Sequence, residues 1–153
     1  MSIISNGIDA FVARMQALYP AAQGWQQLPN PYKPEENPDI FLKQGWGLAF
    51  GSAENSNRQV NCKYSVARSV TVILCRITDA LENDASLKVA ADKALFEDQA
   101  ILINDLEQDI AVNGTTMYTR WETDGGIEYI KGDTDRFLML RTEFRLEYLE
   151  AFT

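Results

Sequence analysis

The stretch RFLMLRTEFRLEYLE, residues Arg136–Glu150, decides the fold. Every second residue from Leu138 forms a mostly apolar set, which comprises Leu138, Leu140, Thr142, Phe144, Leu146 and Tyr148. The residues between them alternate in charge from Arg141 on, and we name Arg141, Glu143, Arg145 and Glu147 the charge ladder. A period of two at roughly 3.3–3.4 Å per residue predicts a half-buried β-strand on the order of 45 Å long. The strand implies a sheet with one face on a core, and the charge ladder raises the question of what the other face contacts.

The chain before this strand predicts a β-meander. Met117–Thr123 and Ile127–Ile130 are β-type runs, and the turn signal Asp124-Gly125-Gly126 between them is typical of a hairpin. Lys131-Gly132-Asp133 predicts a second turn or bulge before the last strand.

The middle of the chain predicts one central strand and one major helix. Ser65–Ile77 alternates at first and becomes apolar on both faces near Val72, as in a strand covered on both sides at its far end. A helix is expected over Ala85–Asp109, closed by Asn113-Gly114. Its predicted core stripe comprises Leu95, Phe96, Leu102, Ile103, Leu106 and Ile110. Asp98, Asp105 and Asp109 group on another face of this helix.

The first part of the chain predicts a short helix, a loop and a short strand. Apolar spacing indicates a helix over Ile8–Tyr19, which begins at Asn6-Gly7 or Asp9 and ends at Pro20. All five prolines fall between residues 20 and 38, so 20–39 is expected to be an ordered, semi-extended loop. A strand is expected over Gly45–Phe50.

Residues 51–61 are expected to form a polar loop. The candidate partner contacts in it are Glu54, Asn55, Asn57 and Arg58; a plain solvated connection is the alternative. The whole chain, 1–153, is thus predicted to form a single α+β domain. In this α/β sandwich a mostly antiparallel sheet with a long C-terminal strand packs against one major helix and a short N-terminal helix.

Composition argues against several classes of function. The chain has no histidine, which excludes histidine-based acid–base and nucleophilic catalysis and most transition-metal sites. Cys62 and Cys75 fit no metal-binding spacing, and no phosphate loop or nucleophile elbow occurs. The net charge of −8 is concentrated in residues 79–109, with nine acids and two bases, and opposes binding to nucleic acid. We expect no enzymatic activity and no cofactor.

One weak metal site remains open. Asp133 and Asp135 could bind Mg²⁺ or Ca²⁺, although beside Gly132 they more simply satisfy backbone amides of a turn. No apolar run approaches the roughly 18 residues of a membrane span, and the first residues lack the features of a signal peptide. We therefore expect a protein without a membrane partner that is made and assembled in a cytoplasm.

The order of these features resembles the tail-terminator (tail-completion) proteins of long, non-contractile-tailed bacteriophages, the lambda-like siphophages. The resemblance rests on an N-terminal helix, the strand SVTVILCRI, a long helix, the hairpin YTRWETDGGIEYI and the final LRTEFRLEYLE, and covers roughly 40–77 and 115–150. It implies a structural virion protein at the neck that forms a homo-hexameric ring on the tail tube. Such a ring stops growth of the tube protein and meets the head-completion or connector protein, while DNA passes through its lumen.

Two surfaces acquire expected roles under this resemblance. The charge ladder would pair with a neighbouring strand, in the same sheet or in the next subunit, or would form a solvated face. Asp98, Asp105 and Asp109 would line the lumen, where like charge prevents DNA from adhering, or would form a solvated face of the helix. A head–tail adaptor or stopper of the neck is the nearest alternative, and a monomeric small-ligand or Mg²⁺-binding module is the alternative from another class.

Overall fold

The computed structural model describes residues 2–31, 44–60, 63–78, 85–109, 111–112, 117–131 and 136–151, with the backbone alone for 56–60, 63 and 151. The helices are α1 (Ile3–Leu18) and α2 (Ala85–Gln108), and a 3₁₀ turn, η1 (Ala21–Gln23), follows α1. The strands are β1 (Trp25–Gln27), β2 (Gln44–Val60), β3 (Lys63–Ile77), β4 (Tyr118–Lys131) and β5 (Arg136–Ala151). The α+β prediction is confirmed.

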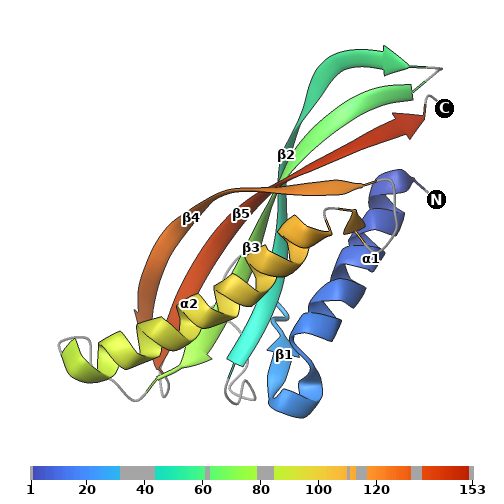
Figure 1. Ribbon diagram of the computed structural model, residues 1–153. Coiled ribbons are helices and arrows are strands. Elements are labelled where there is room, and N and C mark those ends of the chain that lie inside the picture. Colours follow the sequence, from blue (N-terminus) through green and yellow to red (C-terminus); the bar gives the residue numbers. More distant parts are fainter. Residues whose placement is uncertain are drawn as a thin grey trace.

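The strands form one twisted sheet in the order β1-β2-β3-β5-β4 (Figure 1). The short β1 runs parallel to β2, and every other neighbouring pair is antiparallel. The predicted long last strand is therefore present, and it lies between β3 and β4, paired with both along most of its length.

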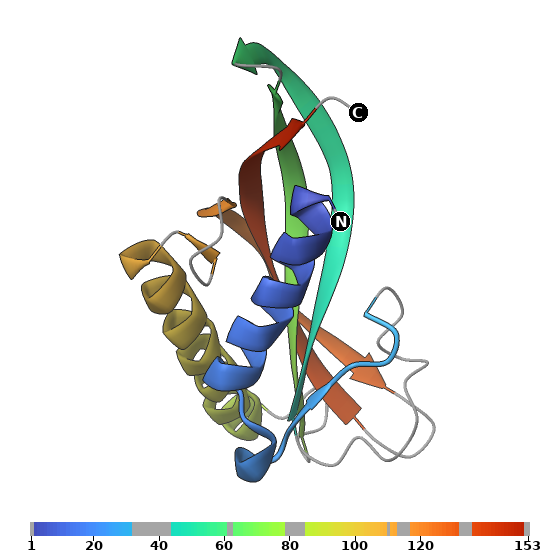
Figure 2. The same ribbon diagram turned by 90° about the vertical axis from the view of Figure 1, so that its right-hand side faces the viewer.

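Both helices cover the same face of the sheet (Figure 2). The alternation expected in β5 is observed, because Leu138, Leu140, Phe144 and Leu146 are buried in the main core with Phe11 and Met15 of α1 and Leu95, Leu102 and Leu106 of α2. A smaller apolar cluster of Leu28, Ile73, Cys75 and Met139 lies on the opposite face. The end of β3 is thus covered on both sides, as predicted.

Helix α1 begins earlier than expected. The Ser2 hydroxyl accepts from the Ser5 N–H, while the N–H groups of Ile3 and Ile4 donate to the Glu150 carboxylate at 3.0 and 3.4 Å. The expected start at residues 6–9 was wrong because one of the two capping groups comes from the far end of β5. A Cβ at Gly7 would stand 2.6 Å from Cε and Sδ of Met117, so a larger residue there would require the buried Met117 side chain to move.

The predicted polar loop at 51–61 was wrong over its described residues. Residues 51–60 continue β2, where Ala53, Glu54 and Asn55 pair with Arg68, Ala67 and Val66 of β3 across two irregularities in register. Backbone pairing with β3 does not require apolar side chains, so a polar sequence is compatible with a strand at the end of the sheet.

The predicted hairpin at Asp124-Gly125-Gly126 was also wrong. This segment lies inside β4, where three steps from Asp124 to Ile127 oppose two steps on β5. Gly126 has a φ of 76° and donates its N–H to Asp124 Oδ1 at 3.0 Å, which makes the segment a glycine bulge.

The remaining expectations are met in part. Residues 20–31 of the predicted proline-rich loop contain η1 and β1, and 32–39 lie outside the described residues. The helix over 85–109 is confirmed to within one residue. Its expected closing residues Asn113-Gly114 and the expected turn at Gly132-Asp133 lie outside the described residues. Phe96, expected in the core, is 46% exposed.

Candidate assembly surfaces

The charge ladder faces away from the helices, and three of its four charges have partners in the same chain. Arg141 donates to Glu128 of β4 at 2.7 Å, and Arg145 donates to Glu147 at 3.1 Å. Both pairs are well exposed, so each contributes about 0–1 kcal/mol to stability. Because β5 lies between β3 and β4, this surface is a sheet face and not an edge; its role between subunits stays a prediction.

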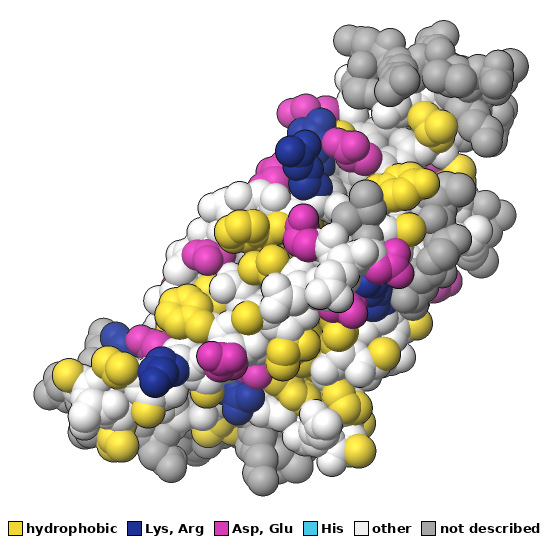
Figure 3. All heavy atoms as spheres, viewed as in Figure 1, with side chains coloured by type: hydrophobic (Ala, Val, Ile, Leu, Met, Phe, Trp, Pro, Cys, Tyr) yellow, Lys and Arg dark blue, Asp and Glu magenta, His cyan; other side chains and the backbone are white. Residues whose placement is uncertain are grey.

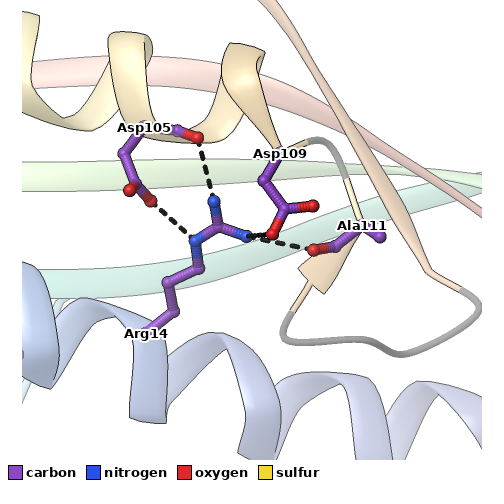
Figure 4. A network of polar contacts seen from close by, with 4 residues as sticks. All are labelled: Arg14, Asp105, Asp109 and Ala111. Carbon is purple, nitrogen blue, oxygen red and sulfur yellow. Dashed lines mark hydrogen bonds and ion pairs between the residues drawn. The ribbon is translucent and has the colours of Figure 1, made fainter.

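The acidic side chains of α2 turn toward basic groups that the sequence did not link to them. Arg14 of α1, itself buried, donates to the Asp105 carboxylate at 2.7 Å and to the carbonyls of Asp105 and Ala111 (Figure 4). Asp109 approaches the same guanidinium at 3.8 Å. Arg14 thus joins α1 to the last carbonyls of α2, where a cation is favourable.

Asp98 is the most buried of the three acids. It is 5% exposed and accepts two hydrogen bonds from Arg76 of β3, one of them 2.8 Å long from Nη2. These bonds raise the pKa of Arg76, although its partial burial opposes the effect. The expectation that Asp98 shares an open acidic face with Asp105 and Asp109 was wrong, because a helical wheel does not reveal an arginine on a distant strand.

Aromatic groups close the same region. The Tyr19 hydroxyl donates to the Asp98 carbonyl at 2.6 Å, and the Arg76 guanidinium lies 5.6 Å from the centre of the Trp25 ring. Burial, and then the nearby charges of Asp98 and Asp105, raise the pKa of Tyr19 far above its ordinary value. This side of α2, which faces α1, is therefore closed by ion pairs and hydrogen bonds.

The other flank of α2 faces β4. Gln99 donates to Thr142 of β5 at 3.0 Å and to Asp124 of β4 at 3.3 Å, and Glu107 accepts from the Trp121 N–H at 3.1 Å. Val89, Phe96 and Ile103 repeat at intervals of seven residues, in helical phase with Gln99 and Glu107, and so lie on this flank.

Large apolar side chains are exposed on and beside this flank. Val89, Phe96 and Trp121 are 58%, 46% and 41% exposed, and we name these three residues the β4-side patch. Figure 3 shows hydrophobic side chains along this part of the surface between scattered charged groups. All the large exposed apolar side chains of the described residues lie on α2 or β4; the others are Leu87, Ile101 and Tyr118. The three residues of the β4-side patch lie on or beside one flank of α2, as the residues of an interaction surface do.

The sheet has two incompletely paired edges. On β2, β1 covers Gln44–Trp46, and no other described strand pairs along Leu48–Val60. On β4, Ala111 forms a β-bridge to Tyr118, and Glu107 accepts a hydrogen bond from the Trp121 N–H. No described strand pairs with the outer edge of Glu122–Lys131. We name Leu48–Val60 and Glu122–Lys131 the open edges.

A groove of about 520 Å³ lies between the start of α1 and the sheet. Its lining includes Ile4, Tyr64, Arg68, Tyr148 and Glu150. Arg68 donates to the Gly51 carbonyl at 2.9 Å, and the Glu150 carboxylate accepts from the first turn of α1. The polar groups of the groove are thus engaged mainly in holding β2, β5 and α1 together.

The remaining candidates supply little chemistry. Within the described ranges, no group of three acidic or cysteine side chains could hold a metal ion, and Asp133 and Asp135 lie outside those ranges. Burial raises the pKa of the Cys75 thiol to about 12, against a smaller opposite effect of Arg141, so the thiol is a poor nucleophile at neutral pH.

The predicted partner-contact residues lie on the strand β2. Glu54 and Asn55 are exposed there, while Asn57 and Arg58 belong to the stretch described by its backbone alone. These residues form part of an open edge, which the loop prediction did not anticipate.

Neither α1 nor α2 combines the length and apolar character needed to cross a membrane.

Comparison with known proteins finds no relative of this chain. No protein-family model matches this sequence, and no curated protein is similar to it.

Proposed function

We propose that this chain is a structural protein of a phage neck, a tail terminator that forms a closed ring on the end of a tail tube. The observation that supports this most is the presence of two open edges on opposite sides of one sheet. A cyclic ring requires two different surfaces on each subunit, because its contacts are heterologous. An unpaired edge offers N–H and C=O groups to a strand of another chain, so the two open edges are candidates for these two surfaces.

Two further observations agree with a structural role. Two of the features on which the resemblance to tail terminators rests, the long helix and the long last strand, are present, whereas the expected hairpin is the single strand β4. The polar side chains of the described core are joined in ion pairs and hydrogen bonds that hold elements together, such as Arg14 with Asp105 and Arg76 with Asp98. In this role the ring would end polymerisation of the tube, join it to the head connector and let DNA pass.

The first experiment is the solution mass by light scattering at high protein concentration, with and without Mg²⁺. A closed ring of six copies of 17.3 kDa would give roughly 104 kDa, unchanged by Mg²⁺, and rings in negative-stain images. If the chain remains monomeric, preformed tubes assembled from siphophage tail-tube protein provide the second assay. Terminal density on these tubes and arrest of their growth support the proposal, and unaltered tubes contradict it.

A ligand-binding module is the second candidate, favoured by the groove beside α1. It predicts a monomer whose melting temperature rises with ligand concentration as mass action requires. A saturable rise with Mg²⁺ that disappears in a variant with Asp133→Asn and Asp135→Asn would favour this candidate. A head–tail adaptor of the neck would form the same ring and is distinguished by binding to the connector instead of the tube.

A further inference from the structure

We propose that the open edge of β4 binds the open edge of β2 of a second copy of this chain, so that the sheet continues from copy to copy. This inference rests on the proposed ring and assigns the two surfaces that would build it. The occupant is argued from two features of the described residues: the direction of the strands and the side chains beside the two edges.

The strand directions are compatible with head-to-tail copies. Each of β2, β3, β5 and β4 is antiparallel to the next, so β2 and β4 run in opposite directions at the two sides of one sheet. If successive copies keep the same face toward the helices, β4 of one copy meets β2 of the next as an antiparallel pair. The two open edges are also similar in length. Antiparallel pairing is slightly more stable per residue than parallel pairing.

The chain itself indicates which part of the β4 edge is available. Ala111 and Glu107 cover its beginning, at Tyr118 and Trp121. Gln99 of α2 lies over Asp124, and α2 runs from there back toward its own start beside the rest of β4. Phe96 and Val89 therefore lie near the part that is left open. A strand that pairs with the outer edge of Glu122–Lys131 would cover these two side chains.

The helix-facing side of the β2 edge offers suitable contacts. Phe50 lies on that side, half-buried, opposite Val70, and Ala53 follows it as an exposed small residue. Glu54, the next residue, pairs with Ala67 and therefore lies on the opposite face of the sheet. Contacts of this edge with α2 of a second copy would thus come from Phe50 and Ala53.

The two open edges lie at different heights on the sheet. The position of each edge along the strand direction can be compared on β5. Through its pairing with β3, Leu48–Val60 aligns with residues 142–151 of β5, whereas Glu122–Lys131 aligns with residues 136–143. Pairing the edges therefore displaces each copy along the strand direction relative to the previous one. A closed sheet needs such a stagger, because its strands are tilted from the axis of closure.

Two variants that each disable one edge test the inference. Phe96→Lys places a charge in the β4-side patch, and Ala53→Lys places one on the β2 edge. Leu87→Lys, on the side of α2 opposite to Phe96, and Ala13→Lys, on α1, are controls at exposed positions. Thermal melts first establish that all four variants fold, and their masses are then measured by analytical ultracentrifugation beside the wild type.

We expect the controls to form the wild-type oligomer and each edge variant to be monomeric. Mixed in equal amounts, the two edge variants still share one intact pair of surfaces, so they should form a dimer of about 35 kDa and stop there, twice 17.3 kDa. Wild-type oligomers from either edge variant would overturn the inference but leave the ring proposal standing. A dimer of Ala53→Lys alone would overturn it as well, since β4 would then pair with itself.

The wild type separates the inference from the proposed function. Open filaments that the edge variants abolish would support edge pairing and contradict a closed ring. A wild-type chain that stays monomeric at about millimolar concentration overturns the inference, whereas the proposed function is then judged by the binding of preformed tail tubes.

Discussion

The two flanks of α2 differ in how many of their side chains find partners or cover within the same chain. On the α1 side, Asp98 and Asp105 form ion pairs with Arg76 and Arg14, and Tyr19 donates to the Asp98 carbonyl. On the β4 side, Val89 and Phe96 are exposed beside an open strand. The same helix therefore has its charges paired on one flank and apolar side chains left exposed on the other.

This difference separates residues that specify the monomer from residues available for assembly. Substitutions on the α1 side should change the free energy of unfolding, since removal of one partner leaves a buried charge unpaired. Substitutions on the β4 side should leave that free energy nearly unchanged and alter association instead. The following predictions test this separation, from the largest expected effect on stability to the smallest.

Asp98→Ala should lower the free energy of unfolding by about 3 kcal/mol, because it leaves the partly buried Arg76 guanidinium without its acceptor. Urea denaturation measures the change, with the exposed neighbour Glu97→Ala as a matched control that should alter stability by less than about 0.5 kcal/mol. A loss below about 1 kcal/mol for Asp98→Ala would mean that the α1 side is not closed as the geometry indicates.

Glu150→Ala should destabilise the first turn of α1 by about 1 kcal/mol, because Ile3 and Ile4 lose the acceptor of their N–H groups and the helix dipole loses a negative charge. Hydrogen exchange should show this as roughly five-fold faster exchange in that turn under conditions of rapid reclosing. Ser2→Ala, which removes the other capping group, serves for comparison. Unchanged exchange would exclude a capping role for Glu150.

The double substitution Arg141→Glu and Arg145→Glu should cost about 1–2 kcal/mol at most, because both ion pairs are well exposed. Its effect on oligomer mass decides between the charge ladder and the open edges as subunit contacts. Edge pairing predicts that the oligomer still forms, whereas loss of the oligomer in a folded variant would assign the interface to the outer face of the sheet.

Phe96→Gln should change the stability of the monomer by less than about 0.5–1 kcal/mol, since its side chain is already half exposed. The same change should weaken self-association at least ten-fold, measured as the shift of the midpoint in a dilution series. Leu102→Ala, one of the buried residues of α2, should instead cost about 2–5 kcal/mol. A large loss of stability in Phe96→Gln would remove the distinction between the two flanks.

Elements with a strong period could be predicted from the sequence. The alternation in β5, the two-sided apolar stretch of β3 and the length of α2 were all visible, because burial on one or both faces leaves a direct pattern in the chain. These elements were sufficient to identify the α+β class. The period also placed Leu95, Leu102 and Leu106 correctly in the core.

The errors occurred where a distant partner decides the outcome. Asp124-Gly125-Gly126 has the composition of a hairpin turn and of a glycine bulge, and only the continued pairing with β5 distinguishes them. Residues 51–60 carry no strand period because their structure depends on β3. Asp98 was assigned to an open face because its partner, Arg76, lies on another element. The open edges, which are relations between strands, could not be read from any single segment.

The position of β5 has a consequence for biosynthesis. It is made after β3 and β4 yet has to be inserted between them, and Glu150 closes a contact with Ile3 across 147 residues. During translation, β2 and β3 can pair early, but the other edge of β3 has no neighbouring strand until β5 has emerged from the ribosome. We therefore expect folding of the sheet to be slow and to finish only after β5 has been synthesised, with the edge of β3 open to wrong pairing until then.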